Sequence, residues 1–261
     1  MHTRIGFFVA MFLVIVLVPV VSSLWWKKKT ESSYRAFFFG ALTFFIAVIV
    51  LESPVSGLLM FMTPLKKLQD MPIALGVFSG LMAGLFEETG RFLLFRSFRK
   101  KDIGRNDANA IMAGLGHGGC EAILLVGVTI IANIIVLLTM NPEMISELPA
   151  EQAQTIKESY DLLVNGGLMD FLPSVVERVI AIGLHVNFAI LVWGAVMKDK
   201  GWLYPVAILI HAFVDFVAVV AMAREVNIWL IEGALALLLV LVSLFGASVY
   251  ASWKRDDSPT L

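Results

Sequence analysis

Seven apolar stretches, each long enough to cross a lipid bilayer as a helix, divide this chain of 261 residues. A transmembrane helix needs about 20 mostly apolar residues to span the roughly 30 Å hydrocarbon layer. Of all residues, 59% are hydrophobic and 16% are charged, against roughly 45–50% and about 25% in soluble domains. The sequence therefore predicts an all-α, polytopic membrane helix bundle of about seven transmembrane helices. The stretches cover residues 5–25, 35–51, 72–95, 108–139, 171–197, 202–223 and 227–252.

The positions of lysine and arginine predict which way the bundle faces. With residues 26–34 placed in the cytoplasm, thirteen basic residues lie on the cytoplasmic side and five on the outer side. Cytoplasmic loops carry an excess of these residues, so we expect the N-terminus outside and the C-terminus inside. The cytoplasmic set is Lys27, Lys28, Lys29, Arg35, Arg96, Arg99, Lys100, Lys101, Arg105, Lys198, Lys200, Lys254 and Arg255, and the outer set is Arg4, Lys66, Lys67, Lys157 and Arg224.

The first stretch resembles a secretory signal peptide, because Arg4 precedes its apolar run. A lysine run at 27–29 follows where a small-residue cleavage site would begin, so we expect a retained anchor. We predict a single integral membrane domain over residues 1–261 with a catalytic core at about 72–223. Residues 140–170 form the largest loop, on the outer side. Its centre, at about 151–163, has a helix-forming composition, so it is either a surface helix or a solvated connector.

Net charge and cysteine content exclude two classes of protein. The formal net charge of −1 provides no basic field for nucleic acid. The single cysteine, Cys120, can form neither an internal disulfide nor a thiolate metal cluster. A nucleophilic pair of Cys120 with His117, three residues away, stays open, and any site must lie between the spans.

Eleven ionisable side chains lie within the predicted spans. Each costs about 2.5–3.5 kcal/mol on insertion scales, so each is a functional-site candidate. Counting 1.5 Å per residue from the predicted cytoplasmic helix ends puts one carboxylate and three imidazoles at similar depth on four helices; these are Glu88, His117, His185 and His211. The other seven are Glu87, Arg91, Glu121, Glu177, Arg178, Asp215 and Glu232. Two of them, Glu177 and Arg178, lie nearer the outer face, where an interfacial anchor or ion pair explains them.

Residue spacing predicts a metal site. His117 and Glu121 are four apart, as are His211 and Asp215, and residues four apart share one helical face. A neutral imidazole ligates a divalent metal through one nitrogen, and a nearby carboxylate completes the coordination or orients the ring. We predict zinc, or another divalent metal, bound by His117, His185 and His211, with Glu121 or Asp215 as fourth ligand or orienting partner.

A carboxylate beside such a metal can act as general base, and Glu88 is the better candidate by depth. Arg91, three residues away, would hold a glutamate ionised or stabilise an oxyanion. Neighbours on a helix diverge by about 100°. Only one of Glu87 and Glu88 can therefore point at the metal, while the other turns toward Arg91 or a neighbouring helix.

These motifs resemble a known family. The run from Glu87 to Arg91 resembles the double-glutamate-plus-base signature of the CAAX prenyl endopeptidase-like and PrsW-like intramembrane proteases, and the run from His211 to Asp215 resembles their later motif. With Gly116 to Glu121, the whole looks most like the YhfC-type intramembrane metalloproteases. The resemblance implies a hydrolase of a bacterial plasma membrane in which the second glutamate, Glu88, is the base.

Three functions stay open. The leading one is an intramembrane metallo-endopeptidase that cleaves a membrane protein or peptide by metal- and glutamate-activated water, with a cavity open to the cytoplasmic half. The alternative is a proton- or ion-coupled small-molecule transporter, because Asp, Glu and His relays mark transporters too. The third is a metal-binding or scaffold protein that has kept the fold without the activity.

Overall fold

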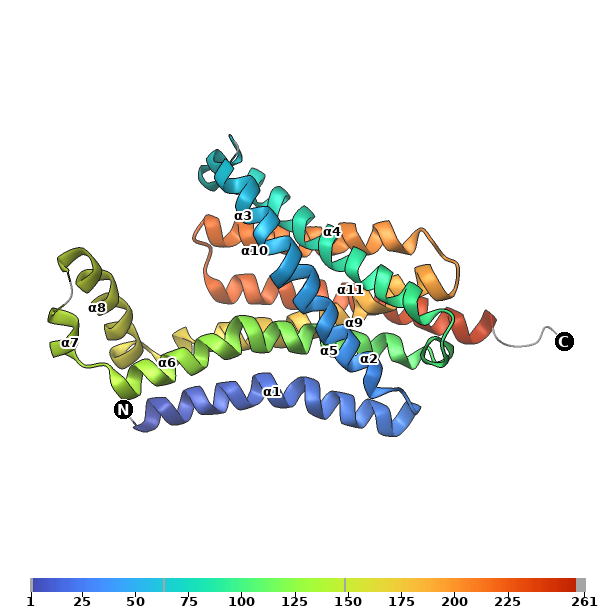
Figure 1. Cartoon of the computed structure of the whole chain (residues 1–261), viewed down its shortest axis with the longest axis horizontal. Coiled ribbons are helices and arrows are strands. Elements are labelled where there is room, and N and C mark those ends of the chain that lie inside the picture. Colours follow the sequence, from blue (N-terminus) through green and yellow to red (C-terminus); the bar gives the residue numbers. More distant parts are fainter. Residues whose placement is uncertain (1, 63, 148, 257–261) are drawn as a thin grey trace.

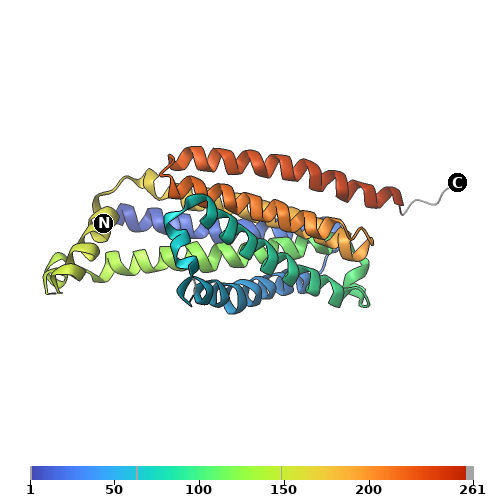
Figure 2. The ribbon, with the colours of Figure 1, turned by 90° about the horizontal axis from the view of Figure 1, so that it is seen from above.

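The computed structural model describes residues 2–62, 64–147 and 149–256, and it is a helical bundle (Figure 1). Long helices lie side by side along one axis, and Figure 2 shows the same bundle turned by 90°. The described residues contain no strand. The predicted all-α class is therefore confirmed.

Within the described ranges, seven helical rods have the length of a membrane span. They are α1 (His2–Thr30), α2 with η1 and α3 (Tyr34–Phe44, Phe45–Glu52 and Ser53–Met62), α4 (Pro72–Phe98), α5 with η4 and α6 (Ala108–Ala122, Ile123–Gly127 and Val128–Thr139), α9 (Leu172–Met197), α10 (Leu203–Ala223) and α11 (Ile228–Asp256). Six are long and apolar enough to cross a membrane, by length and composition. The seventh is α4, which carries Glu87, Glu88 and Arg91 in its interior.

The second rod is longer than the sequence predicts. We expected it to stop at residue 51, but a π-helical segment, η1, continues into α3 and the rod ends at Met62. The wider π turn lets the Ser53 N–H bond to the carbonyl of Val48. Pro54, which has no N–H, follows in the first turn of α3, where it is tolerated.

The loop at 140–170 folds into helices. It contains α7 (Pro142–Ser146), α8 (Ala150–Asn165) and η5 (Leu168–Asp170), so the surface-helix alternative is correct. The short connections elsewhere include η2 (Pro64–Asp70) and η3 (Asp102–Arg105). The guanidinium of Arg4 in α1 donates to the carbonyl oxygens of Leu163 (3.0 Å) and Gly166 (2.5 Å), which satisfies the C-terminus of α8.

This contact places the start of α1 at the end of the bundle that carries α8, and α11 ends at the opposite end (Figure 1). We call these the α8 end and the C-terminal end. How these two ends face the membrane, with the N-terminus outside and the C-terminus inside, stays a prediction. The side chains of three residues in the charge count, Lys66, Lys254 and Arg255, lie outside the described residues.

Close backbone packing brings α4 and α5 to the bundle centre. A side chain at Gly80 of α4 would overlap the carbonyl oxygen of Ala212 in α10, and one at Gly116 of α5 would overlap that of Phe37 in α2. Glycine allows such approach because it has no Cβ. The helix α9 packs against α5, α11, α4 and α10, and every residue from 187 to 196 is buried.

Candidate metal centre

Four helices place ionisable side chains around one point in the bundle. All of them are buried except Asp215, whose side chain is 34% exposed. Helix α4 contributes Glu87, Glu88 and Arg91, α5 contributes His117 and Glu121, α9 contributes His185, and α10 contributes His211 and Asp215.

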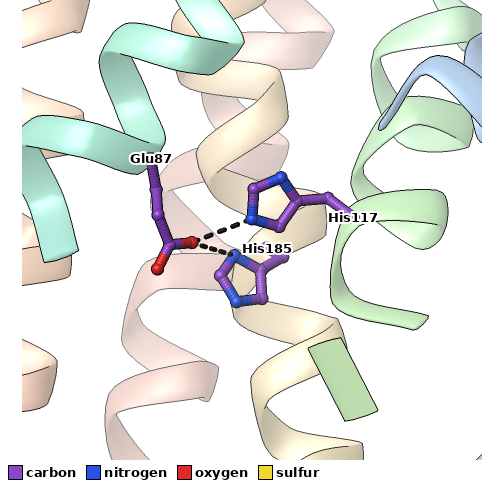
Figure 3. A group of neighbouring side chains, drawn as sticks. All are labelled: Glu87, His117 and His185. Carbon is purple, nitrogen blue, oxygen red and sulfur yellow. Dashed lines mark hydrogen bonds and ion pairs between the residues drawn. The ribbon is translucent and has the colours of Figure 1, made fainter. Parts of the chain in front are cut away.

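Three of these residues lie close enough together to hold one metal ion (Figure 3). Oε2 of Glu87 lies 2.8 Å from Nε2 of His117 and 3.9 Å from Nδ1 of His185. The three ligand atoms lie within 4.8 Å of one another. Donors around one tetrahedral zinc ion lie roughly 3.3 Å apart, since zinc–nitrogen bonds are about 2.0–2.1 Å. Two imidazoles and a carboxylate are a donor set that zinc accepts, so these residues, called the triad below, fit a divalent metal.

The two glutamates of α4 point in different directions. Nη1 of Arg91 donates to both oxygens of Glu88, at 2.5 and 2.6 Å, and Glu88 is completely buried. The sequence interpretation pointed Glu88 at the metal, but in the structure Glu88 meets Arg91 while Glu87 faces His117 and His185. The roughly 100° between neighbours on a helix explains the divergence, and the packing of α4 decides which residue faces which way.

His211 lies beside the triad. Its Nδ1 is 2.8 Å from Oε1 of Glu88, and its Nε2 is 3.9 Å from Oε1 of Glu87 and 3.7 Å from Oδ2 of Asp215. Its ring centroid is 5.5 Å from that of His185, which is 4.7 Å from that of His117. The three imidazoles expected to gather are thus brought together, but Glu87 takes the place in the triad that the sequence interpretation gave to His211.

Glu121 contacts His185, whereas its sequence spacing predicts a contact with His117. It was paired with His117 on the face of α5, yet in the structure it contacts Nε2 of His185 and accepts a hydrogen bond from Nη1 of Arg178 at 2.5 Å. A metal-ligating histidine usually donates its second ring N–H to a carboxylate in this way. Glu121 is therefore placed to orient His185.

Arg178 contacts the site, although its position in the sequence predicts only an ion pair near the outer face. It pairs with Glu177, as expected of an interfacial ion pair, but it also bonds to Glu121 and so reaches His185 through that carboxylate. The sequence separation of Arg178 and His185 could have indicated this contact. Arg178 and His185 are seven residues apart, which is close to two helical turns and puts both on one face of α9.

Comparison with known proteins identifies the family. The family described as YhfC intramembrane metalloprotease matches residues 14–235. The chain belongs to this family. A relative from Bacillus subtilis (strain 168), named Uncharacterized membrane protein YhfC, is 30% identical over 214 residues, which cover 81% of this chain and 80% of the relative. No solved structure gives a significant match. The resemblance found in the sequence is confirmed, and the YhfC-family chain is a multi-pass membrane protein.

Proposed function

We propose that this protein is an intramembrane metallo-endopeptidase of a bacterial plasma membrane that hydrolyses a peptide bond of a membrane-associated substrate. The observation that carries the proposal is the triad itself. Two imidazoles and a carboxylate from three helices share one small space in the interior of a membrane bundle, where each ionisable group is costly to place. The family description supports the same activity.

Glu87, His117 and His185 would hold the metal, with zinc as the proposed ion. When bound, a zinc ion supplies Lewis-acid activation of water and of the substrate carbonyl. Nη2 of Arg91 lies 3.2 Å from Nδ1 of His185, so Arg91 would release this nitrogen if His185 held a metal through it. Arg91 would still be paired with Glu88, because Nη1, a different nitrogen of its guanidinium, donates to both oxygens of Glu88.

His211 is placed to carry the proton. Glu88 accepts from Nδ1–H of His211, which leaves Nε2 as the basic nitrogen on the side of Glu87 and Asp215. Water attacks the scissile carbonyl carbon, its proton passes to Nε2, and Nε2 returns that proton to the amide nitrogen as the carbon–nitrogen bond breaks. Glu88, the base in the sequence interpretation, becomes a positioning residue that acts through His211, and Arg91 holds Glu88 in place.

The experiment measures metal content and hydrolysis separately on the purified full-length protein. We expect His117→Ala and His185→Ala to lose metal and hydrolysis of a transmembrane peptide. We expect His211→Gln to keep metal while hydrolysis falls about 10²–10⁴-fold, the range for a lost acid–base group. His2→Ala is the matched control, since His2 is an exposed histidine at the end of α1.

Several outcomes contradict the proposal. If the wild-type protein binds metal but cleaves no transmembrane peptide, the remaining function is that of a metal-binding scaffold. Ion-dependent solute uptake into proteoliposomes without cleavage would favour the coupled transporter. If His211→Gln loses metal as completely as His117→Ala, then His211 is a ligand, as the sequence interpretation has it.

A further inference from the structure

A small cavity adjoins the triad and extends mainly in one direction, with Phe188 as the one lining residue of α9 beyond His185 among the described residues. Its volume is about 70 Å³, which is room for a few water molecules. Glu87, His185 and His211 form its inner part. From there its lining follows α9 back to Glu177 and α10 forward to Ala218, and Leu235 of α11 completes the wall. Because α9 starts and α10 ends at the α8 end, the cavity extends from the imidazoles toward that end.

Charged and histidine side chains follow the same direction on these three helices. They are Glu177, Arg178 and His185 on α9, His211 and Asp215 on α10, and Glu232 on α11. The remaining stretches toward the C-terminal end, residues 186–197, 203–210 and 233–253, contain no Asp, Glu, Lys, Arg or His. Ionisable groups in a membrane pair with one another or line water-filled paths, so their distribution marks one side of the site as wet.

Exposure decreases inward along this path. The side chains of Glu177 and Asp215 are 30% and 34% exposed, whereas that of Glu87 is 8% exposed. Carboxylates exposed to hydrocarbon are strongly unfavourable, which indicates that the two outer ones face water. Glu232 is buried, and its Oε2 has no hydrogen-bond partner among the described residues; water is the partner that such a group requires.

The opposite direction is closed by packed side chains. Phe188 stacks on His211 with ring centroids 4.6 Å apart, and toward the C-terminal end Phe95 packs edge-on against Trp193 at 5.0 Å. All residues of α9 from 187 to 196 are buried. Among the described residues, α9 is therefore closed by packed side chains toward the C-terminal end, the end that we predict to be cytoplasmic.

We propose that water reaches the triad through a one-sided passage between α9, α10 and α11 that opens at the α8 end, next to Glu177 and Asp215. This reverses the cytoplasmic opening expected from the sequence. One consequence rests on the proposed function: the bond that the protein hydrolyses lies in the half of the bilayer next to α8. The passage itself does not depend on hydrolysis.

Thiol accessibility tests the passage on the full-length protein. Cys120 is the single cysteine, so Cys120→Ala gives a background without thiols. Ala218→Cys places a thiol in the cavity lining, and a membrane-impermeant, charged methanethiosulfonate reagent is added to one side of oriented vesicles. Gln152→Cys in α8 and Lys101→Cys at the opposite end, both exposed positions, identify the two sides.

Phe213→Cys is the matched control, because Phe213 lies in α10 between His211 and Asp215 but is 52% exposed on the outer surface of the bundle, where lipid excludes a charged reagent. We expect Ala218→Cys to react at least about 10-fold faster than Phe213→Cys, and only from the side that labels Gln152→Cys. Ala181→Cys, on the α9 wall of the cavity, repeats the test if Ala218→Cys does not fold.

Labelling from the side of Lys101→Cys, or labelling no faster than that of Phe213→Cys, overturns the passage. Neither result depends on whether the protein cleaves peptides or holds metal. Failure of the passage and failure of the proposed function are therefore distinguishable.

Discussion

Two arginine–glutamate pairs lie on opposite sides of the His185 ring, and their surroundings differ. Arg91, paired with Glu88, contacts Nδ1, whereas Glu121, paired with Arg178, contacts Nε2. The side chains of the first pair are 2% and 0% exposed, and those of the second are 11% and 12% exposed. The first pair is almost completely buried, and the second adjoins the proposed passage.

The difference in burial shows how one bundle can use two ion pairs of the same residue types for two purposes. A fully buried pair must satisfy its charges internally, and Arg91 does so with two bonds to Glu88 while Glu88 also accepts from His211. A pair near water tolerates adjustment, and Arg178 shares its guanidinium between Glu121 and Glu177. We therefore expect the first pair to govern stability and the second to govern the orientation of His185.

The largest effect is expected from Arg91→Ala. Removing one partner of a buried ion pair leaves an uncompensated charge and costs about 3–5 kcal/mol, so the free energy of unfolding should fall by that amount. Thermal unfolding in detergent, followed by tryptophan fluorescence, measures it. A loss no larger than that of Arg178→Ala would remove the distinction between the two pairs.

A double variant sharpens this comparison. Glu88→Leu combined with Arg91→Met replaces the whole pair by apolar side chains, which is often neutral for stability. We expect the free energy of unfolding to fall by less than in Arg91→Ala, by about 1–3 kcal/mol, because only the buried Nδ1–H of His211 loses its acceptor. We also expect loss of hydrolysis, because His211 no longer has an orienting carboxylate. Recovery of hydrolysis along with stability would show that Glu88 does not position His211.

A smaller effect, on metal affinity, is expected from Arg178→Gln. Without the guanidinium, Glu121 loses the partner that holds it against Nε2 of His185, and loss of such outer partners lowers metal affinity about 10–100-fold. Competition with a chelator measures the affinity. Arg178→Lys should restore part of it because the charge returns without the forked geometry, and unchanged affinity in both variants would contradict the orienting role.

The smallest effect is expected from Glu177→Gln. Its side chain is 30% exposed, and Arg178 retains Glu121 as a partner. Partly exposed ion pairs contribute about 0–1 kcal/mol, so both unfolding and metal affinity should stay close to wild type. A chelator titration that shows the same loss as Arg178→Gln would mean that Glu177, rather than Glu121, directs the arginine.

Much of the fold could be predicted because the thickness of the bilayer sets a minimum length for each transmembrane helix. An apolar run of membrane length has few alternatives to a helix, so the stretch at 108–139 has the bounds of the rod formed by α5, η4 and α6. The second rod ran past its predicted end because the π turn before Pro54 depends on local backbone bonding that hydropathy does not report.

The site could be predicted as a set of residues but not as a set of contacts. Helical rise gave the depth of His117, His185 and His211, and the structure brings their rings together. Spacing within one helix paired Glu121 with His117, yet its partners lie on α9. Local periodicity shows which residues share a face and does not show what that face meets.

The sequence by itself therefore determined the class of protein, its long helices, the candidate residues and the family, because length, hydropathy and motif order are properties of the chain alone. Only the tertiary structure decided that Glu87 faces the histidines, that Glu88 meets Arg91 and that Arg178 reaches the site. The physical reason is helix rotation. The face that α4 presents follows from backbone packing on α10, as at Gly80, and a turn of about 100° would exchange neighbouring residues.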